Sequence, residues 1–91
     1  MVALATGYVS MINILFFAQT RERLNCENLQ LEVESGLHVS ALKSQLQQKN
    51  ELWHEVFSSD LLCAVNQALV PSTHVIDDGD EVAFFPPVTG G

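Results

Sequence analysis

Residues 77–91 read DDGDEVAFFPPVTGG. Within them, EVAFF is a short run of strand-forming residues, and the DDGD before it is typical of a turn. Pro86 and Pro87 come next, and because proline has no amide hydrogen and a fixed φ, the pair ends sheet pairing and extends the chain. The stretch therefore predicts a final strand that passes directly into an extended tail.

The last four residues of that tail suit a narrow binding site. Val88 and Thr89 are β-branched, which favours extended backbone, while Gly90 and Gly91 have no side chain to clash with tunnel walls. This segment has one reactive group, the carboxyl group of Gly91, and a carboxylate must be activated before its acyl group can be transferred. Adenylation by ATP in a partner's site is the usual route. We expect Gly91 to be the working residue, the alternative being an incidental frayed end.

Upstream segments supply the rest of a small fold. Strand patterns are found in INILFF at 12–17, LQLEVE at 29–34 and LLCAVNQALV at 61–70. The last of these should turn near Asn66, since asparagine tolerates positive φ. Between the second and third strands, Ser40 can cap a main helix, and an apolar stripe from Leu52 to Phe57 predicts a second, shorter helix.

This order of two strands, a helix and further strands predicts the β-grasp or ubiquitin-like architecture. It is an α+β fold with one main helix packed across one mixed sheet. Its first and last strands lie side by side at the sheet centre, so a free C-terminal tail would leave from the middle. Residues 1–10 show no clear period, whereas a strand pattern opens at Met11. We therefore predict an N-terminal extension at 1–10, a β-grasp domain at 11–85 and a functional tail at 86–91.

Size and charge limit the classes of partner. Ninety-one residues suffice for one domain, and the net charge is −7. From Glu51 onward every charged residue is acidic, which disfavours binding to nucleic acid or to an anionic membrane. There is no apolar run near the roughly 20 residues that span a bilayer and no signal-peptide pattern, so we expect a cytoplasmic protein.

The residues that most often bind metals are scattered. Cys26 and Cys63 form no CxxC unit, and His38, His54 and His74 show no ligand spacing. Cys63 lies in an apolar strand, where a small buried thiol is the ordinary interpretation. We therefore expect no metal site, no disulfide framework and no cofactor bound by this chain.

Strand alternation predicts a docking surface beside the tail. If Phe16 and Phe84 face the helix, then Phe17 and Phe85 point outward, and adjacent central strands would bring the outward pair together. Leu69 is a plausible third member. An exposed aromatic patch beside a functional tail indicates a binding site, the alternative being that one phenylalanine belongs to the core.

Three segments resemble the MoaD family, the small sulfur-carrying subunits of molybdopterin synthase. DGDEVAFFPPVTGG resembles the C-terminal signature of that family, and LFFAQTRE and AVNQALV resemble its other hallmark segments. The likeness extends from Met11 to Gly91. It implies that Arg21 contacts partner proteins.

The resemblance also implies a mechanism. An adenylating enzyme related to the ubiquitin-activating enzymes would use ATP to convert the Gly91 carboxylate to an acyl-adenylate, and a sulfur donor would replace AMP to leave a thiocarboxylate. The tail would then insert into the large subunit of a heterotetramer of two small and two large subunits. There the sulfur would attack cyclic pyranopterin monophosphate, and two deliveries would build the dithiolene. The small subunit would not be an enzyme by itself, and catalytic side chains would lie in the large subunit.

Other functions remain open from the sequence. A sulfur carrier for thiamin thiazole synthesis would share the fold and the Gly-Gly chemistry. A ubiquitin-like modifier would instead form an isopeptide bond between Gly91 and a target lysine. The simplest alternative is an acidic binding module with an incidental tail.

Overall fold

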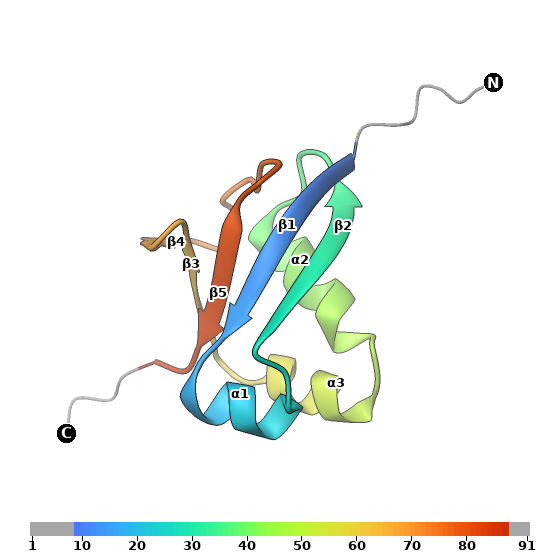
Figure 1. Ribbon diagram of the computed structural model, residues 1–91, viewed down its shortest axis with the longest axis vertical. Helices are drawn as coiled ribbons and strands as arrows, with labels where there is room; N and C mark the ends of the chain where they lie inside the picture. Colours follow the sequence, from blue (N-terminus) through green and yellow to red (C-terminus); the bar gives the residue numbers. More distant parts are fainter. Residues whose placement is uncertain (1–8, 88–91) are drawn as a thin grey trace.

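The computed structural model describes residues 9–87 (Figure 1). The predictions for Val88, Thr89, Gly90 and Gly91 lie outside the described residues, as do residues 1–8. The elements occur in the order β1 (Val9–Phe16), α1 (Ala18–Leu24), β2 (Asn28–Glu34), α2 (Val39–Gln47), α3 (Glu51–Ser58), β3 (Leu62–Val65), β4 (Ala68–Val70) and β5 (Glu81–Phe85).

The strands form one mixed sheet in the order β2-β1-β5-β3-β4. Strands β1 and β5 are parallel, with Ile14 opposite Val82 and Phe16 opposite Phe84, and every other neighbouring pair is antiparallel. Strand β5 is therefore central, as Figure 1 shows. This topology confirms the predicted β-grasp fold, and the chain leaves the middle of the sheet at Pro86.

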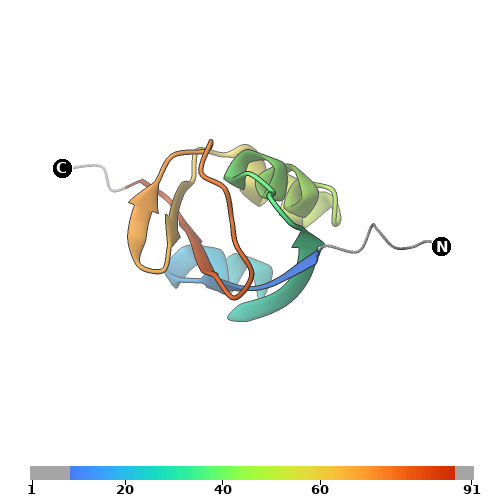
Figure 2. The ribbon, with the colours of Figure 1, turned by 90° about the horizontal axis from the view of Figure 1, so that it is seen from above.

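The hydrophobic core lies between the sheet and α2 and α3, which pack on the same side of it (Figure 2). Ile12, Ile14 and Phe16 are buried from β1, as are Val82 and Phe84 from β5. These are the inward positions that the alternation predicted.

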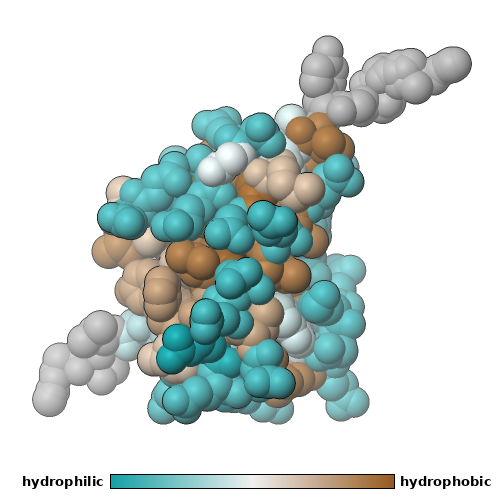
Figure 3. Space-filling model, viewed as in Figure 1, coloured by the Kyte–Doolittle hydropathy of each residue, from teal (hydrophilic) through white to brown (hydrophobic). Residues whose placement is uncertain are grey.

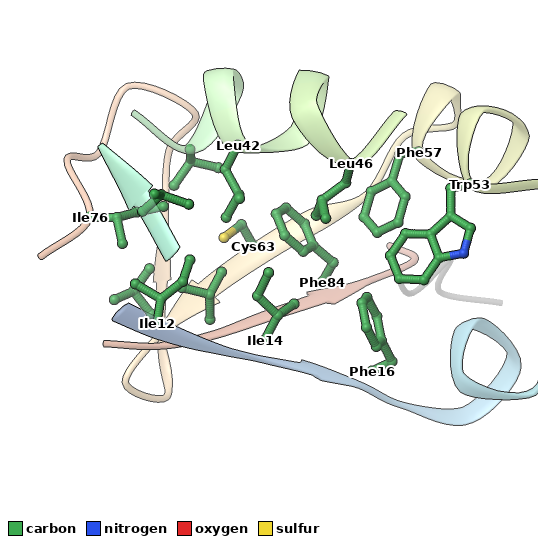
Figure 4. Close-up of a cluster of buried hydrophobic side chains, with 14 of the residues drawn as sticks. Ile12, Ile14, Phe16, Leu42, Leu46, Trp53, Phe57, Cys63, Ile76 and Phe84 are labelled. Atoms are coloured by element: carbon green, nitrogen blue, oxygen red, sulfur yellow. The ribbon is translucent and has the colours of Figure 1, made fainter. Parts of the chain in front are cut away.

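An aromatic cluster occupies one end of this core (Figure 4). The ring of Phe57 lies edge-on to Phe84 at 5.3 Å between centroids and is stacked on Trp53 at 5.8 Å. Phe16 meets Trp53 edge-on at 5.5 Å. Aromatic pairs of this kind contribute about 0.5–1.5 kcal/mol each beyond the area they bury. They hold α3 against the ends of β1 and β5.

The turn between β3 and β4 is hydrogen-bonded to the turn that precedes β5. Asn66 and Gln67 have positive φ angles of 51° and 71°, which make a tight hairpin between β3 and β4, as the Asn66 prediction required. The Asn66 side chain also donates to Asp80 Oδ1 at 2.9 Å and accepts from the Glu81 amide at 3.0 Å. The hairpin turn is thus bonded to the turn that precedes β5.

The structure corrects three details of the sequence prediction. Strand β1 begins at Val9 rather than Met11, because Val9 and Ser10 already pair with Glu34 and Val33. Ser40 does not cap α2, whose N-cap residue is His38 without a side-chain bond. Leu52 is 42% exposed, since α3 uses Trp53, Val56 and Phe57 for its buried face. Whether residues 1–10 are an addition stays a prediction.

The capping of α2 has a physical reason. Its first free amides bond to the loop that comes after β4: the Val39 amide donates to the His74 carbonyl and the Ser40 amide to the Ser72 carbonyl, both at 3.0 Å. Amides satisfied in this way have no need of a serine cap. The start of α2 is therefore fixed by a distant segment and not by its own sequence.

Candidate functional site

The sheet face that points away from α2 and α3 is apolar near the end of β5. The strand register aligns one residue from each of four neighbouring strands in a row across the sheet: Leu15, Ala83, Ala64 and Leu69. In the neighbouring row, Phe85 of β5 lies opposite Leu62 of β3. Together with Phe17 these residues are called the outer apolar face: Leu15, Phe17, Leu62, Ala64, Leu69, Ala83 and Phe85.

Several of these side chains are open to solvent. Leu69 is 66% exposed, Phe17 47% and Leu62 39%, while Leu15 and Phe85 are half-buried. Figure 3 shows hydrophobic surface over the middle of the face in this view, with hydrophilic atoms above and below it. Contiguous apolar surface with a polar border is typical of a site that binds another protein.

Phe17 is 47% exposed and Phe85, the last residue of β5, is half-buried, so both reach the surface as the alternation predicted. The last residues that pair between β1 and β5 are Phe16 and Phe84; Phe17 follows β1 as the N-cap residue of α1, and Phe85 is the last residue of β5. Leu69 shares the face but lies a row away from Phe85, because its partner is Ala64. Their role in docking stays a prediction.

Sequence reasoning missed Leu62, which lies directly opposite Phe85. The signal was present in LLCAV, because Cys63 and Val65 are buried and alternation then turns Leu62 and Ala64 outward. Leu15 could have been found in the same way from its buried neighbours in β1.

Arg21 lies at the border of this face. Its amide donates to the carbonyl of Phe17 at 3.3 Å, so the two residues are one helical turn apart and on the same side of α1. The guanidinium is about half exposed, and its Nη1 lies 4.0 Å from Glu27 Oε2. A long contact of this kind between exposed groups contributes little and leaves the cation available to a partner.

The tail begins at the same end of the sheet. Pro86 and Pro87 are exposed directly after Phe85 and are the last described residues of the chain. Proline at both positions removes two amide donors, which stops β5 from pairing further. The outer apolar face and the start of the tail therefore adjoin.

The other reactive side chains do not gather into a site. Burial raises the pKa of the Cys63 thiol to about 11, so this thiol stays protonated and unreactive near neutral pH. Between Val9 and Pro87, no group of three or more His, Cys, Asp or Glu could hold a metal ion. No helix in that part of the chain has the length and apolar character needed to cross a membrane.

Comparison with known proteins places this site in context. A model described as the ThiS family matches residues 14–91. The molybdopterin synthase sulfur carrier subunit of Haemophilus influenzae is 45% identical over 82 residues, which cover 89% of this chain and 100% of the relative. The subunit of the same name from Escherichia coli is 44% identical over 82 residues, with coverages of 89% and 100%.

Solved structures also resemble this chain in fold. Small archaeal modifier protein 1 of Haloferax volcanii has a TM-score of 0.74 and covers 87% of this chain and 99% of its own, but at 17% identity it shows a shared fold alone. A complex of subunits 1 and 2 of the molybdopterin-converting factor from Helicobacter pylori matches with a TM-score of 0.62 and 26% identity, covering 89% of this chain and 99% of that one.

Proposed function

Because the chain belongs to the ThiS family and to the molybdopterin synthase sulfur carrier subunits, we propose that it carries sulfur as a thiocarboxylate on Gly91. It delivers that sulfur to cyclic pyranopterin monophosphate bound by the large subunit of a molybdopterin synthase. One observation supports this most directly: the central strand of the sheet ends beside the outer apolar face and continues into Pro86 and Pro87, and in the sequence these prolines are followed by a segment that contains Gly90 and Gly91. A partner can then bind the face while its active site receives the tail.

Loading begins with activation of a poor electrophile. The Gly91 carboxylate attacks the α-phosphate of ATP in an adenylating enzyme, pyrophosphate leaves, and an acyl-adenylate forms. Hydrosulfide released by the donor then attacks the acyl carbon, AMP leaves with the electron pair of the broken bond, and loss of the sulfur-bound proton to solvent gives the anion. The product is a thiocarboxylate in which one sulfur has replaced one oxygen. The adenylating enzyme supplies the nucleotide site, and this chain supplies the acyl group.

Delivery uses the chemistry of that product. A thiocarboxylate is a soft nucleophile that remains anionic at neutral pH, and its sulfur attacks the pterin precursor inside the partner. A narrow site that admits only the side-chain-free Gly90 and Gly91 also keeps water from the acyl intermediate until transfer is complete. Water then breaks the acyl–sulfur bond of the thioester formed between Gly91 and the pterin, which restores the carboxylate and leaves the sulfur on the pterin, and two deliveries supply the dithiolene. Proton transfers fall to side chains of the large subunit.

The test is the intact mass of the purified chain after incubation with its adenylating enzyme, ATP and a sulfur source. We expect the mass to rise by the difference between one sulfur and one oxygen, and to return to its starting value after incubation with the large subunit and the pterin precursor. A chain with one residue added after Gly91 is the matched control and should not load. No mass change in the unmodified chain, under conditions that activate a known carrier, would contradict the proposal.

The same experiment separates the other recipients. A ubiquitin-like modifier would appear as covalent conjugates on lysines of other proteins instead of a free thiocarboxylate. A carrier for thiamin thiazole synthesis would load sulfur but would not release it to the large subunit.

A further inference from the structure

Strand β2 forms one edge of the sheet, since in the strand order it pairs with β1 alone, and β1 separates it from β5 (Figure 1). Its seven residues, Asn28 to Glu34, pair with β1 without interruption, so the strand has no bulge. It also contains no proline and no lysine. Short length, bulges, prolines and lysines usually keep an edge strand from pairing with another chain. Strand β2 has none of these features, whereas β4 at the opposite edge has only three residues.

The hydrogen-bond pattern identifies the backbone groups on the free side of β2. The Phe16 amide donates to the Glu27 carbonyl at 3.0 Å, in continuation of the β1–β2 register. Hydrogen-bonded positions alternate along an antiparallel pair, so every second residue counted from Glu27 bonds to β1. The residues between them turn their amides and carbonyls to the free side, and these include Gln30, Glu32 and Glu34. Within residues 9–87, no other segment bonds to these backbone groups.

The core-facing side chains of β2 leave apolar surface at this edge. Leu29 and Leu31 pack against the core but are half-buried, whereas Val33 is buried. An added strand would place every second side chain beside these leucines, because residues opposite each other on paired strands point to the same face. Apolar residues at those positions would cover the exposed parts of both leucines.

The other face of β2 carries negative charge that the described residues do not neutralise. Glu32 and Glu34 are exposed, and neither forms an ion pair with any residue from 9 to 87. Their partners on β1 are the uncharged Met11 and Val9. Opposite charges on paired strands are stabilising and like charges are destabilising. Pairing of β2 with the same strand of a second copy would gather the carboxylates of both copies on one face, so the charge favours a basic strand instead.

We propose that the free edge of β2 binds an extended segment of another protein, in which apolar residues alternate with lysine or arginine, as a further antiparallel strand. The backbone of that segment pairs with Gln30, Glu32 and Glu34. Its apolar side chains cover Leu29 and Leu31, and its cations face the two glutamates. This edge shares no residue with the outer apolar face, and the inference holds whether or not the chain carries sulfur.

The first experiment titrates the full chain with capped peptides in which lysine and valine alternate. We expect binding, with slower amide hydrogen exchange at Gln30 and Glu32 and no change at Leu69 near the opposite edge. A lysine–valine peptide methylated on its lysine amides should not bind, because these amides face β2 in the antiparallel register. Methylation on the valine amides is the matched control and should preserve binding, and a glutamate–valine peptide should not bind. Equal binding of all three lysine peptides, or no binding of the unmethylated one at millimolar concentration, would overturn the proposal.

The second experiment tests the charge of the edge. Combining Glu32→Gln with Glu34→Gln should weaken binding of the lysine–valine peptide by about 2- to 30-fold, the range for loss of two cross-strand ion pairs. A chain with Glu51→Gln and Asp60→Asn loses the same charge at exposed positions outside β2 and should bind as the unmodified chain does. Equal weakening in the two double variants would reduce the effect to net charge and refute the site. Dimers of the chain alone, with slowed exchange at the same edge amides, would assign the edge to a second copy and refute the basic occupant.

Discussion

Phe16 and Phe84 lie opposite each other in the parallel pair of β1 and β5, and both are buried. This one pairing fixes the orientation of the next residue on each strand. Those residues, Phe17 and Phe85, face outward, and the residue after Phe85 begins the tail. The geometry of the core thus determines both where the outer apolar face lies and where the chain leaves the sheet at Pro86.

The first prediction concerns the length of the tail. Deletion of Gly91, or addition of one residue after it, should abolish sulfur loading and delivery, because the acyl group would no longer sit at the activated position. Thermal unfolding should be unchanged, since the core lies within residues 9–87. Molybdopterin production by an extended chain with the purified large subunit would show that Gly91 is not the carrier.

The second prediction concerns docking. Phe85→Asp and Leu69→Asp should each weaken binding to the large subunit, by about 2 kcal/mol if the residue is a hot spot, as measured by calorimetry. Leu69→Asp should leave stability unchanged because Leu69 is 66% exposed, and Phe85→Asp should lower it modestly because Phe85 is half-buried.

Leu52→Asp is the matched control for docking. Leu52 is 42% exposed but lies on α3, away from the outer apolar face. Its binding should equal that of the unmodified chain. Equal weakening by all three variants would point to a general effect of added negative charge and not to a docking face.

The third prediction concerns the aromatic cluster. Phe57 is fully buried and meets the rings of Phe16, Trp53 and Phe84. Phe57→Ala should reduce the free energy of unfolding by about 3–5 kcal/mol, because it leaves a cavity in the middle of the cluster. Urea unfolding followed by tryptophan fluorescence measures this directly. A loss below about 1 kcal/mol, the scale of an ordinary surface change, would mean that the cluster closes around the gap.

The fourth prediction concerns the turn before β5. The Asp80 carboxylate accepts from the Asn66 side chain at 2.9 Å and from the Asp77 amide at 2.8 Å. Asp80→Ala should cost about 0.5–1.5 kcal/mol of stability, since the turn loses two hydrogen bonds whose exposed donors can bond to water instead. Asp60→Ala, an exposed acid before β3, serves as the control for charge. Comparable losses in the two variants would indicate that net charge, and not the turn, sets the effect.

The fifth prediction concerns pH. Burial raises the pKa of Cys63 from 9.0 to about 11, so between these values the thiol ionises in the unfolded chain but not in the folded one. The contribution of Cys63 to stability is complete below pH 9 and should be lost as the pH rises toward 11. Cys63→Ala should remove this part of the alkaline decline in chemical denaturation. An identical decline in the variant would assign it to other groups.

The sequence was sufficient for the central part of the fold. Period-two alternation in β1 and β5 identified the inward set, including Ile14 and Val82, although both faces of these strands carry large apolar residues. The hairpin at Asn66 was predictable because few residues other than asparagine and glycine accept positive φ.

The details that escaped prediction depend on contacts between distant segments. Ser40 has the right chemistry for a helix cap, but its own amide is bonded to Ser72 in the loop after β4. Nothing near Ser40 in the sequence signals that loop. Leu62 was recognisable as outward, but its position opposite Phe85 depends on strand register, which a single sequence does not specify.

The parallel pairing of β1 and β5 also has a consequence for synthesis on the ribosome. Asn13 is opposite Glu81, so the sheet joins the first described strand to the last. Contacts at such sequence separation form slowly, and β1 must wait without its neighbour until β5 has emerged. The five-stranded sheet is therefore completed only after nearly all of residues 9–87 have left the ribosome, and a chain that stopped short of β5 would lack the strand that joins β1 to β3.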